Sequence, residues 1–520
     1  MEHPTAALPQ RFNFARHILE INAGRAAKTA YIDDKTQLSY GELDQRVRRF
    51  AAGLLASGIH REERILLVMH DTVDMPVAFL GALFAGVVPV PVNTLLPPDD
   101  YAYMIEHSRA QAVVVSLPLL ANVRQALAKT GAKPELILSG AEPGAEGLHS
   151  VADLLASDPL PLEGAADTYA DDFAFWLYSS GSTGRPKGAV HSHGNLFWTA
   201  ELYGKPVLGV NTEDTVFSAA KLFFAYGLGN GLTFPLSVGA TVVLMAERPT
   251  PEAVFKRLVQ YKPTVYCGVP TLYVSMMASE ALPARKDVAI RVCASAGEAL
   301  PREVGEKFRN HFGCDILDGL GSTEMLHIFI SNQVGAVHYG SSGKPVPGYE
   351  VELRDENQRP VGMGEIGDLY IKGPSAALLY WCNREKSRVT FQGDWLKTGD
   401  KYVCDAEGYY TYAGRSDDML KVSGQYVSPI EIENVMIEHP AVLECAVVGK
   451  LDSEGLVKTA AYVVLAKGHT GSSELAEELK TFVKGKLAPH KYPREIEWIS
   501  ELPKTATGKI QRFKLRALQA

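Results

Sequence analysis

The stretch "YSSGSTGRPKGAVHSHGN", Tyr178 to Asn195, begins as a polar loop and continues into a short apolar run. Its first eleven residues hold three glycines, four serine or threonine side chains, an arginine and a lysine. Glycine lets the backbone adopt positive φ and approach a ligand closely, and the polar groups suit a polyphosphate. The common phosphate loop reads G-x-x-x-x-G-K-[ST], whereas here Arg185-Pro186-Lys187-Gly188 follows Gly184. The stretch predicts a phosphate-binding loop, and the alternative is a flexible surface loop.

Length and composition indicate a globular protein of more than one domain. A chain of 520 residues exceeds what one hydrophobic core usually supports. Its 46% hydrophobic and 22% charged residues are ordinary for such a protein. The net charge of −8 argues against a nucleic-acid partner bound through a broad basic surface. Any anionic ligand is therefore expected to be bound by local lysines, arginines and backbone amides.

The cysteines and the apolar runs favour a cytoplasmic protein without a membrane partner. Six cysteines are scattered along the chain without a C-x-x-C pair, which is typical of reduced, buried thiols rather than disulfides or a zinc site. The first residues show no basic start followed by an apolar segment, so we expect no signal peptide. The apolar run Met75–Val92 contains Pro89 and Pro91, so it predicts a buried helix and a strand rather than a membrane span.

Apolar strand-like runs alternate with amphipathic segments through the first 350 residues. Continuous apolar runs, which are typical of strands covered on both faces, occur at Arg64–His70, Ala110–Ser116, Gly239–Met245 and Pro263–Pro270. Amphipathic stretches such as Tyr40–Gly58 separate them. This alternation predicts an α/β fold with mostly parallel sheets.

The pattern changes near residue 350. Tyr349–Gly373 has short strands and turns, as in an antiparallel sheet or small barrel, and Asp405–Gly414 predicts a hairpin. A helix is expected after Ser428, with Ser428 as N-cap and Glu431 completing a capping box. The last hundred or so residues then form a self-contained α+β unit. We therefore expect domains at 1–416 and 417–520, with a hinge around Arg415–Asp418.

Several further polar stretches suit a nucleotide. Glu324 is well placed for Mg²⁺, which prefers hard oxygen ligands beside phosphate oxygens, and Asp400 is a plausible acceptor for ribose hydroxyls. Each stretch alone has an ordinary explanation as a turn, cap or surface loop, but the combination in this order favours a nucleotide site. The stretches are SAGEALP (Ser295–Pro301), DGLGSTE (Asp318–Glu324), WLKTGD (Trp395–Asp400), GRSDD (Gly414–Asp418) and PKTATGKIQR (Pro503–Arg512).

These motifs together resemble the adenylate-forming superfamily of acyl- and aryl-CoA ligases, peptide-synthetase adenylation domains and luciferases, over essentially the whole chain. Within it, Lys221–Leu236 and Gly319–Asn332 are most similar to benzoate–CoA ligases. The resemblance implies a large N-terminal domain of two parallel-rich βα subdomains and a small β-barrel-like subdomain, with a mobile α+β C-terminal domain.

The resemblance also implies a two-step ligase reaction in the degradation of aromatic compounds. Benzoate would attack the α-phosphate of ATP with Mg²⁺, giving benzoyl-AMP and pyrophosphate, and coenzyme A would then take the acyl group. Carboxylate and triphosphate repel each other, and one unit charge at 4 Å contributes about 4 kcal/mol at an effective dielectric near 20. A lysine and a metal ion can therefore dominate the barrier.

The resemblance assigns ATP contacts to most of the motif residues. Many relatives have an aromatic residue where this chain has Leu320, so adenine packing is expected to be aliphatic on that side. The expected ATP-binding residues are Ser179, Ser180, Gly181, Ser182, Thr183, Gly184, Lys187, Gly297, Glu298, Ala299, Asp318, Gly319, Leu320, Gly321, Ser322, Thr323, Asp400 and Arg415, with Glu324 for the metal.

Catalytic roles fall on two lysines. Lys509 would bridge the carboxylate and the α-phosphate in the first step. The C-terminal domain would then rotate about Asp417, bringing Lys421 to the acyl carbonyl and Gly424 beside the pantetheine arm of coenzyme A. A surface lysine remains the alternative for each. Acetylation of Lys509 by an acetyltransferase, reversed by a deacetylase, would remove its charge.

The acid pocket expected from the resemblance is flat and mostly apolar. Its residues are Ala225, Tyr226, Gly321, His327 and Ile328, with Tyr226 and Ile328 on the two faces of the ring. His327 would hydrogen-bond near the carboxylate or only close the wall. Such a pocket discriminates poorly among substituted benzoates, because one small group contributes only about 1–3 kcal/mol.

Several alternatives stay open at this point. The acid could be hydroxybenzoate, a halobenzoate or a short fatty acid, or the protein could load a carrier protein's phosphopantetheine. A nucleotide sensor without catalysis is the alternative from another class. A homodimer is a further open expectation.

Overall fold

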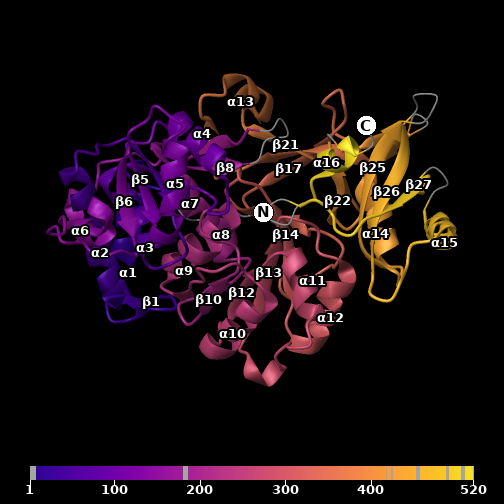
Figure 1. Cartoon of the computed structure of the whole chain (residues 1–520), viewed down its shortest axis with the longest axis horizontal. Helices are drawn as coiled ribbons and strands as arrows, with labels where there is room; N and C mark the ends of the chain where they lie inside the picture. Colours follow the sequence, from indigo (N-terminus) through magenta and orange to yellow (C-terminus); the bar gives the residue numbers. More distant parts are fainter. Residues whose placement is uncertain are drawn as a thin grey trace. The chain divides into compact units, whose positions relative to one another are not determined.

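The computed structural model describes residues 7–179, 185–416, 418–422, 425–451, 457–487, 491–504 and 510–518 (Figure 1). The chain divides into two compact units. Unit 1 comprises Met1–Tyr339, Gly343–Glu350 and Lys372–Leu396, and unit 2 comprises Gly340–Ser342, Val351–Ile371 and Lys397–Ala520. The domain boundary expected at residue 416 stays a prediction.

The first sheet of unit 1 is parallel and covered on both faces. Its strand order is β4 (Val88–Pro91), β3 (Arg64–Val68), β5 (Ala112–Ser116), β6 (Glu135–Ser139) and β7 (His149–Ser150). Alternate residues face opposite cores, so Ile65 packs with α2 (Tyr40–Ala56) and α3 (Asp74–Ala85), and Leu66 with α4 (Pro98–Ser108). The apolar run at Met75 is thus a buried helix followed by a strand. Among the described residues, no helix combines the length and apolar character needed to cross a membrane.

The second sheet of unit 1 has nine strands. Their order is β16 (Lys344–Pro345), β15 (Ile328–Ser331), β14 (Ile316–Gly321), β13 (Val292–Ala296), β12 (Val265–Gly268), β10 (Thr215–Ser218), β11 (Thr241–Val243), β1 (Thr29–Ile32) and β2 (Gln37–Ser39). The six strands from β14 to β1 are parallel, whereas β15, β16 and β2 at the two ends pair antiparallel with their neighbours. Helices α10 (Pro251–Tyr261), α11 (Pro270–Ala278) and α12 (Arg302–Phe312) cover one face (Figure 1). The motifs SAGEALP and DGLGSTE therefore lie at the carboxyl ends of adjacent strands, where ligands of parallel sheets usually bind.

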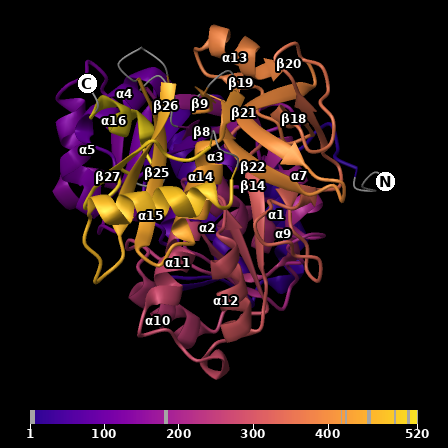
Figure 2. The ribbon, with the colours of Figure 1, turned by 90° about the vertical axis from the view of Figure 1, so that its right-hand side faces the viewer.

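The opening stretch forms a β-hairpin in a third sheet. β8 (Phe173–Ser179) and β9 (Lys187–Ser192) are antiparallel, and Ser179 pairs with Lys187 at the loop. β19 (Leu379–Tyr380) joins the other edge of β9, and the three strands lie side by side (Figure 2). Residues 180–184 of the loop lie outside the described residues. β9 leads directly into α7 (His193–Thr199).

The β-rich segment after residue 350 forms an open sheet. Its path runs β17 (Glu350–Arg354), β18 (Ile366–Lys372), β21 (Trp395–Cys404) and β20 (Phe391–Gln392), and β22 (Tyr410–Arg415) pairs with β21. Among the described strands the path does not close, so the expected barrel-like subdomain is an open sheet. The predicted hairpin at Asp405–Gly414 corresponds to the antiparallel pair β21–β22.

The rest of unit 2 has the expected α+β pattern. It contains β25 (Val442–Leu451), β26 (Val457–Leu465) and β27 (Glu495–Trp498), with α14 (Pro429–Ile437) and α15 (Ser473–Lys484). Ser428 caps α14 by accepting a hydrogen bond from the Glu431 amide at 3.2 Å. The Glu431 carboxylate binds Lys491 at 2.7 Å, so the predicted capping box is only half formed.

Candidate functional site

One end of the phosphate loop contacts a motif carboxylate in unit 1, and the other end contacts a tyrosine bound to that carboxylate. Ser179 Oγ donates a hydrogen bond to Glu324 Oε1 at 3.2 Å. Tyr380 donates to the same oxygen at 2.7 Å, and Lys187 Nζ lies 3.5 Å from the Tyr380 hydroxyl. The loop hairpin, the DGLGSTE turn and β19 therefore converge on Glu324. The predicted loop residues Ser180, Gly181, Ser182, Thr183 and Gly184 lie outside the described residues.

Glu324 fits the metal role proposed for it. Its Oε1 accepts the two hydrogen bonds above, and among the described residues Oε2 accepts none. The described residues contain no cluster of three or more metal-ligating side chains. One carboxylate suits Mg²⁺, which is commonly bound through one or two carboxylates together with substrate phosphates and water. Glu324 would hold the ion, and the phosphates would complete its shell.

A buried polar network supports the turn that carries Glu324. His191 Nε2 lies 2.8 Å from the Thr323 carbonyl oxygen, and Asn195 Nδ2 lies 2.8 Å from His191 Nδ1. Asn195 Nδ2 also donates to the Ala376 carbonyl at 2.9 Å. Burial lowers the pKa of His191 to about 4, so the ring is neutral near pH 7. These residues and Tyr380 were not predicted from the sequence, and the only signal for the first two is a pair of polar side chains at the junction of β9 and α7.

The residues predicted for the acid pocket come together around His327. Its Nε2 lies 3.3 Å from the Tyr226 carbonyl oxygen. Its ring is surrounded by Phe234, Tyr203 and Tyr226, with centroid separations of 4.5, 5.1 and 5.4 Å. Burial lowers the pKa of His327 to about 3. A neutral ring whose Nε2 donates to a carbonyl offers only an acceptor at Nδ1, so this arrangement presents no donor to a carboxylate.

Glycines make room for this histidine. A Cβ on Gly229 would lie 2.3 Å from His327 Cδ2, and a Cβ on Gly321 would lie 2.7 Å from the His327 carbonyl oxygen. Gly321 is paired with Ile328 across β14 and β15. Ala225 and Ile328 are buried, whereas Tyr226 is partly exposed. Either glycine substituted by a larger residue would displace the wall of the predicted pocket.

The predicted adenine residues follow β13 and β14. Gly297 has φ of +100°, and Ala299 is exposed beside the partly exposed Glu298. The Asp318 side chain is buried, and its Oδ2 accepts a 3.4 Å hydrogen bond from the Leu300 amide. Burial raises the pKa of Asp318 to about 7. In this arrangement the Asp318 carboxyl group lies within the protein, and its backbone carbonyl accepts hydrogen bonds from the Asn332 amide at 3.0 Å and from Asn332 Nδ2 at 3.1 Å.

The neighbouring motif residues differ in exposure. Gly319 is packed so tightly that an added Cβ would lie 2.8 Å from Ile328 Cγ2. Leu320, Gly321, Ser322 and Thr323 are partly exposed. The Ser322 hydroxyl accepts a hydrogen bond from the Met325 amide at 3.1 Å, which closes the turn after β14.

Unit 2 contains the residues predicted for ribose and for the thioester step. Asp400 and Arg415 are register partners in β21–β22 and form an ion pair of 3.0 Å. Asp417, Gly424 and Lys509 lie outside the described residues. The Lys421 backbone belongs to β23 (Leu420–Val422), which pairs with β24 (Gln425–Val427).

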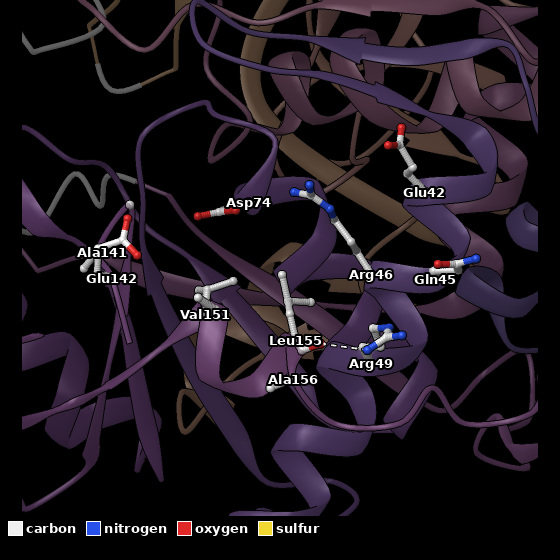
Figure 3. Close-up of a pocket in the computed structure, with 12 residues that line it drawn as sticks. Glu42, Gln45, Arg46, Arg49, Asp74, Ala141, Glu142, Val151, Leu155 and Ala156 are labelled. Atoms are coloured by element: carbon white, nitrogen blue, oxygen red, sulfur yellow. Dashed lines mark hydrogen bonds between the residues drawn. The ribbon is translucent and has the colours of Figure 1, made fainter. Parts of the chain in front are cut away.

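A separate hollow of about 630 Å³ lies in unit 1 and contains none of the predicted site residues (Figure 3). Arg46 and Arg49 of α2 line it together with Asp74, Glu142 and Leu155. The Arg49 guanidinium donates to the Leu155 carbonyl at 3.2 Å. Side chains of both charge signs line the hollow, so its lining does not favour an anionic or a cationic ligand.

Comparisons with known proteins identify relatives of one enzyme class. The AMP-binding enzyme family matches residues 19–381, and the AMP-binding enzyme C-terminal domain matches residues 431–509. A benzoate–CoA ligase of Thauera aromatica is 54% identical over 518 residues, which are 99% of this chain and 97% of the relative. A 4-hydroxybenzoate–CoA/benzoate–CoA ligase of Rhodopseudomonas palustris is 47% identical over 503 residues, covering 95% of this chain and 92% of the relative.

Solved structures of similar ligases match the whole architecture. A benzoate CoA ligase of Burkholderia xenovorans LB400 has a TM-score of 0.91 and 63% identity, covering 97% of this chain and 100% of its own. An anthranilate CoA ligase in complex with anthranoyl-AMP has a TM-score of 0.92 and 41% identity, covering 98% of each chain.

Proposed function

This chain belongs to the AMP-binding enzyme family, and we propose that it is an AMP-forming benzoate–CoA ligase. The proposal rests on the similarity to two benzoate–CoA ligases, which are 54% and 63% identical over nearly the full length. The enzyme joins benzoate to ATP, releasing pyrophosphate and forming benzoyl-AMP. It then transfers the benzoyl group to the thiol of coenzyme A, releasing AMP.

The residues around the phosphate loop support the first step. Ser179 and Lys187 flank the loop that would surround the β- and γ-phosphates, and Glu324 beside them would hold Mg²⁺. Bound Mg²⁺ would offset the phosphate charge that repels the carboxylate. Asp400 and Arg415 would fix the ribose, and the loops after β13 and β14 would frame the adenine.

The wall around His327 supports a small aryl acid. Tyr226 and Ile328 would contact the ring faces, and Ala225 and Gly321 leave room for a flat molecule. The histidine wall is uncharged near pH 7, so it favours an apolar ring. Ring-substituted acids are the second candidates, because one relative is a 4-hydroxybenzoate–CoA/benzoate–CoA ligase.

The C-terminal residues would divide the two half-reactions. Lys509 would bridge the carboxylate and the α-phosphate, and rotation about Asp417 would replace it with Lys421 and Gly424 for thioester formation. Domains 1–416 and 417–520, a cytoplasmic location, a homodimer and acetylation of Lys509 belong to the same proposal.

A panel of acids tests this function. The purified chain is mixed with ATP, Mg²⁺ and coenzyme A and with benzoate, 4-hydroxybenzoate, 2-aminobenzoate, 4-chlorobenzoate or hexanoate, and AMP and thioester are quantified. We expect equal amounts of benzoyl-CoA and AMP, with the highest kcat/KM for benzoate. A higher kcat/KM for another acid would replace the substrate. Benzoyl-AMP formation without thioester, relieved by a phosphopantetheinyl carrier protein, would favour carrier loading instead.

A further inference from the structure

The turn that carries Glu324 is fixed through three successive carbonyl groups. The Thr323 carbonyl accepts from His191 Nε2 at 2.8 Å, the Glu324 carbonyl from the Ala377 amide at 2.7 Å, and the Met325 carbonyl from Ser375 Oγ at 2.8 Å. The next residue, Leu326, has φ of +66°, a conformation that needs support in a non-glycine residue. His191 differs from the other two donors because it belongs to the phosphate-loop hairpin.

The hydrogen-bond partners determine which nitrogen of His191 carries the proton. A carbonyl oxygen can only accept, so Nε2 carries the hydrogen toward Thr323. Nδ1 is then the acceptor, and Asn195 Nδ2 supplies its donor. The remaining groups of Asn195 are also satisfied, since Oδ1 accepts from Ser192 Oγ at 2.8 Å and Nδ2 donates to Ala376. A flipped Asn195 amide would place an oxygen against the Ala376 carbonyl, so only one arrangement satisfies every partner.

The ring of His191 is enclosed by its neighbours. His191 is fully buried and stacks on Phe175, with centroids 5.2 Å apart and an interplanar angle of 18°. The Thr323 carbonyl, in a partly exposed residue, would lose its donor if the ring were absent, and loss of one such hydrogen bond costs roughly 0.5–1.5 kcal/mol. The turn would then relax, and the carboxylate of the next residue would move with it.

We propose that His191, oriented by Asn195, is a positioning residue for the metal–nucleotide site, because it couples the phosphate-loop hairpin to the turn that aims Glu324. The role rests on the proposed function of Glu324. It predicts that loss of the His191 hydrogen bond weakens Mg²⁺–nucleotide binding and adenylation. The thioester step starts from benzoyl-AMP and does not depend on the metal-holding carboxylate, so it should be weakened less than Mg²⁺-dependent nucleotide binding.

His191→Leu and His191→Gln test the proposal, with His193→Gln as the matched control. The Gln side chain can place a donor where His191 Nε2 lies. His193 is an equally buried histidine two residues on, whose Nδ1 accepts from the Phe14 amide at 3.2 Å rather than from the turn. Each variant is titrated with a non-hydrolysable ATP analogue, with and without Mg²⁺, by calorimetry. Its KM for benzoate and its conversion of supplied benzoyl-AMP to benzoyl-CoA are also measured.

We expect His191→Leu to weaken Mg²⁺-dependent analogue binding at least about tenfold, which corresponds to about 1.4 kcal/mol. His191→Gln should recover most of that loss, and His193→Gln should bind the analogue like the parent. Equal weakening in His191→Leu and His193→Gln would reduce His191 to a packing role and overturn the proposal, as would equal loss in the benzoyl-AMP reaction. The ATP analogue binds without the acid. If the parent protein made no benzoyl-CoA but His191→Leu still weakened analogue binding, only the proposed function would be overturned. If His191→Leu does not fold, Asn195→Leu replaces it as the disrupted variant, and its analogue binding is compared with that of His191→Gln.

Discussion

Tyr380 donates a 2.7 Å hydrogen bond to Glu324, although the two residues lie 56 positions apart. The contact exists because β19 pairs with β9, which places Tyr380 opposite Ala189 at the edge of the phosphate-loop hairpin. A short strand late in unit 1 therefore contributes to the orientation of the carboxylate that we assign to the metal.

Tyr380→Phe should lower kcat/KM for ATP by about tenfold, because hydrogen bonds to charged groups contribute about 1.5–3 kcal/mol. The KM for benzoate should stay near that of the parent. Tyr178→Phe is the matched control, since Tyr178 lies on β8 of the same three-stranded sheet but its hydroxyl contacts His107 at 2.9 Å. Steady-state kinetics with varied ATP check the prediction. The same kcat/KM for ATP in both variants would remove Tyr380 from the site.

His327→Ala and Ile328→Ala should weaken the use of benzoate and improve the relative use of ring-substituted benzoates. Each change removes wall volume and ring contact, and one small group contributes about 1–3 kcal/mol to discrimination. The ratio of kcat/KM for benzoate to that for its methyl derivatives measures the effect. If both variants keep the parent's ratio, these residues do not form the pocket wall.

Lys509→Ala should reduce benzoyl-AMP formation more than about a hundredfold, because a lost cation contact in the transition state costs about 3 kcal/mol. The variant should still convert supplied benzoyl-AMP to benzoyl-CoA. Lys421→Ala should show the reverse pattern. Pyrophosphate release and thioester formation are assayed separately, and equal damage to both steps by Lys509→Ala would contradict alternating use of the two lysines.

Acetylated Lys509 should behave like Lys509→Ala, since acetylation removes the same charge. Enzyme carrying acetyl-lysine at this position is compared with unmodified enzyme in the pyrophosphate assay. Normal adenylation by the acetylated enzyme would exclude this residue as a control point.

Acid should destabilise the protein partly through its buried histidines. Burial lowers the pKa of His193 to about 4, so between about pH 4 and pH 6.5 only the unfolded chain protonates it. The unfolded state then binds more protons, and the free energy of unfolding falls by about 1.4 kcal/mol per pH unit for each such group as pH decreases. His193→Gln removes this proton uptake.

The loss in unfolding free energy from pH 6.5 to pH 5 should therefore be about 2 kcal/mol smaller in His193→Gln than in the parent. Urea unfolding at the two pH values measures the difference. Burial also raises the pKa of Asp71 to about 6 and that of Asp318 to about 7, and these groups act in the opposite direction. They are present in both proteins and cancel in the comparison. An equal loss in both proteins would show that His193 is not buried in its neutral form.

Local sequence patterns predicted many elements but not their partners. The run at Met75 became α3 and β4, and Ser428 caps α14, because both features depend on neighbours in sequence. Glu431 was assigned to a capping box, yet its carboxylate binds Lys491, which lies sixty residues away. A local pattern could not indicate that competitor.

The candidate site shows the same limit. Its motif residues were recognisable in the sequence because their residue types suit phosphate and metal. The Thr323 carbonyl has no residue-specific signature, so its partner His191, 132 positions earlier, could not be predicted. Tyr380 was missed for a related reason, because a strand of two residues carries almost no pattern.

The supports of the Glu324 turn also limit how this enzyme can be recombined with its relatives. Hydrogen bonds join residues 178–195, 321–327 and 374–381 to one another. The donors are His191, Asn195, Ser375 and Tyr380, and the acceptors are Thr323, Ala376, Met325 and Glu324. A chimera that imports the loop hairpin alone would combine donors from one parent with acceptors from another. Crossover points for directed evolution should therefore keep these three segments together as one inherited block, while substrate-pocket residues outside them are varied freely.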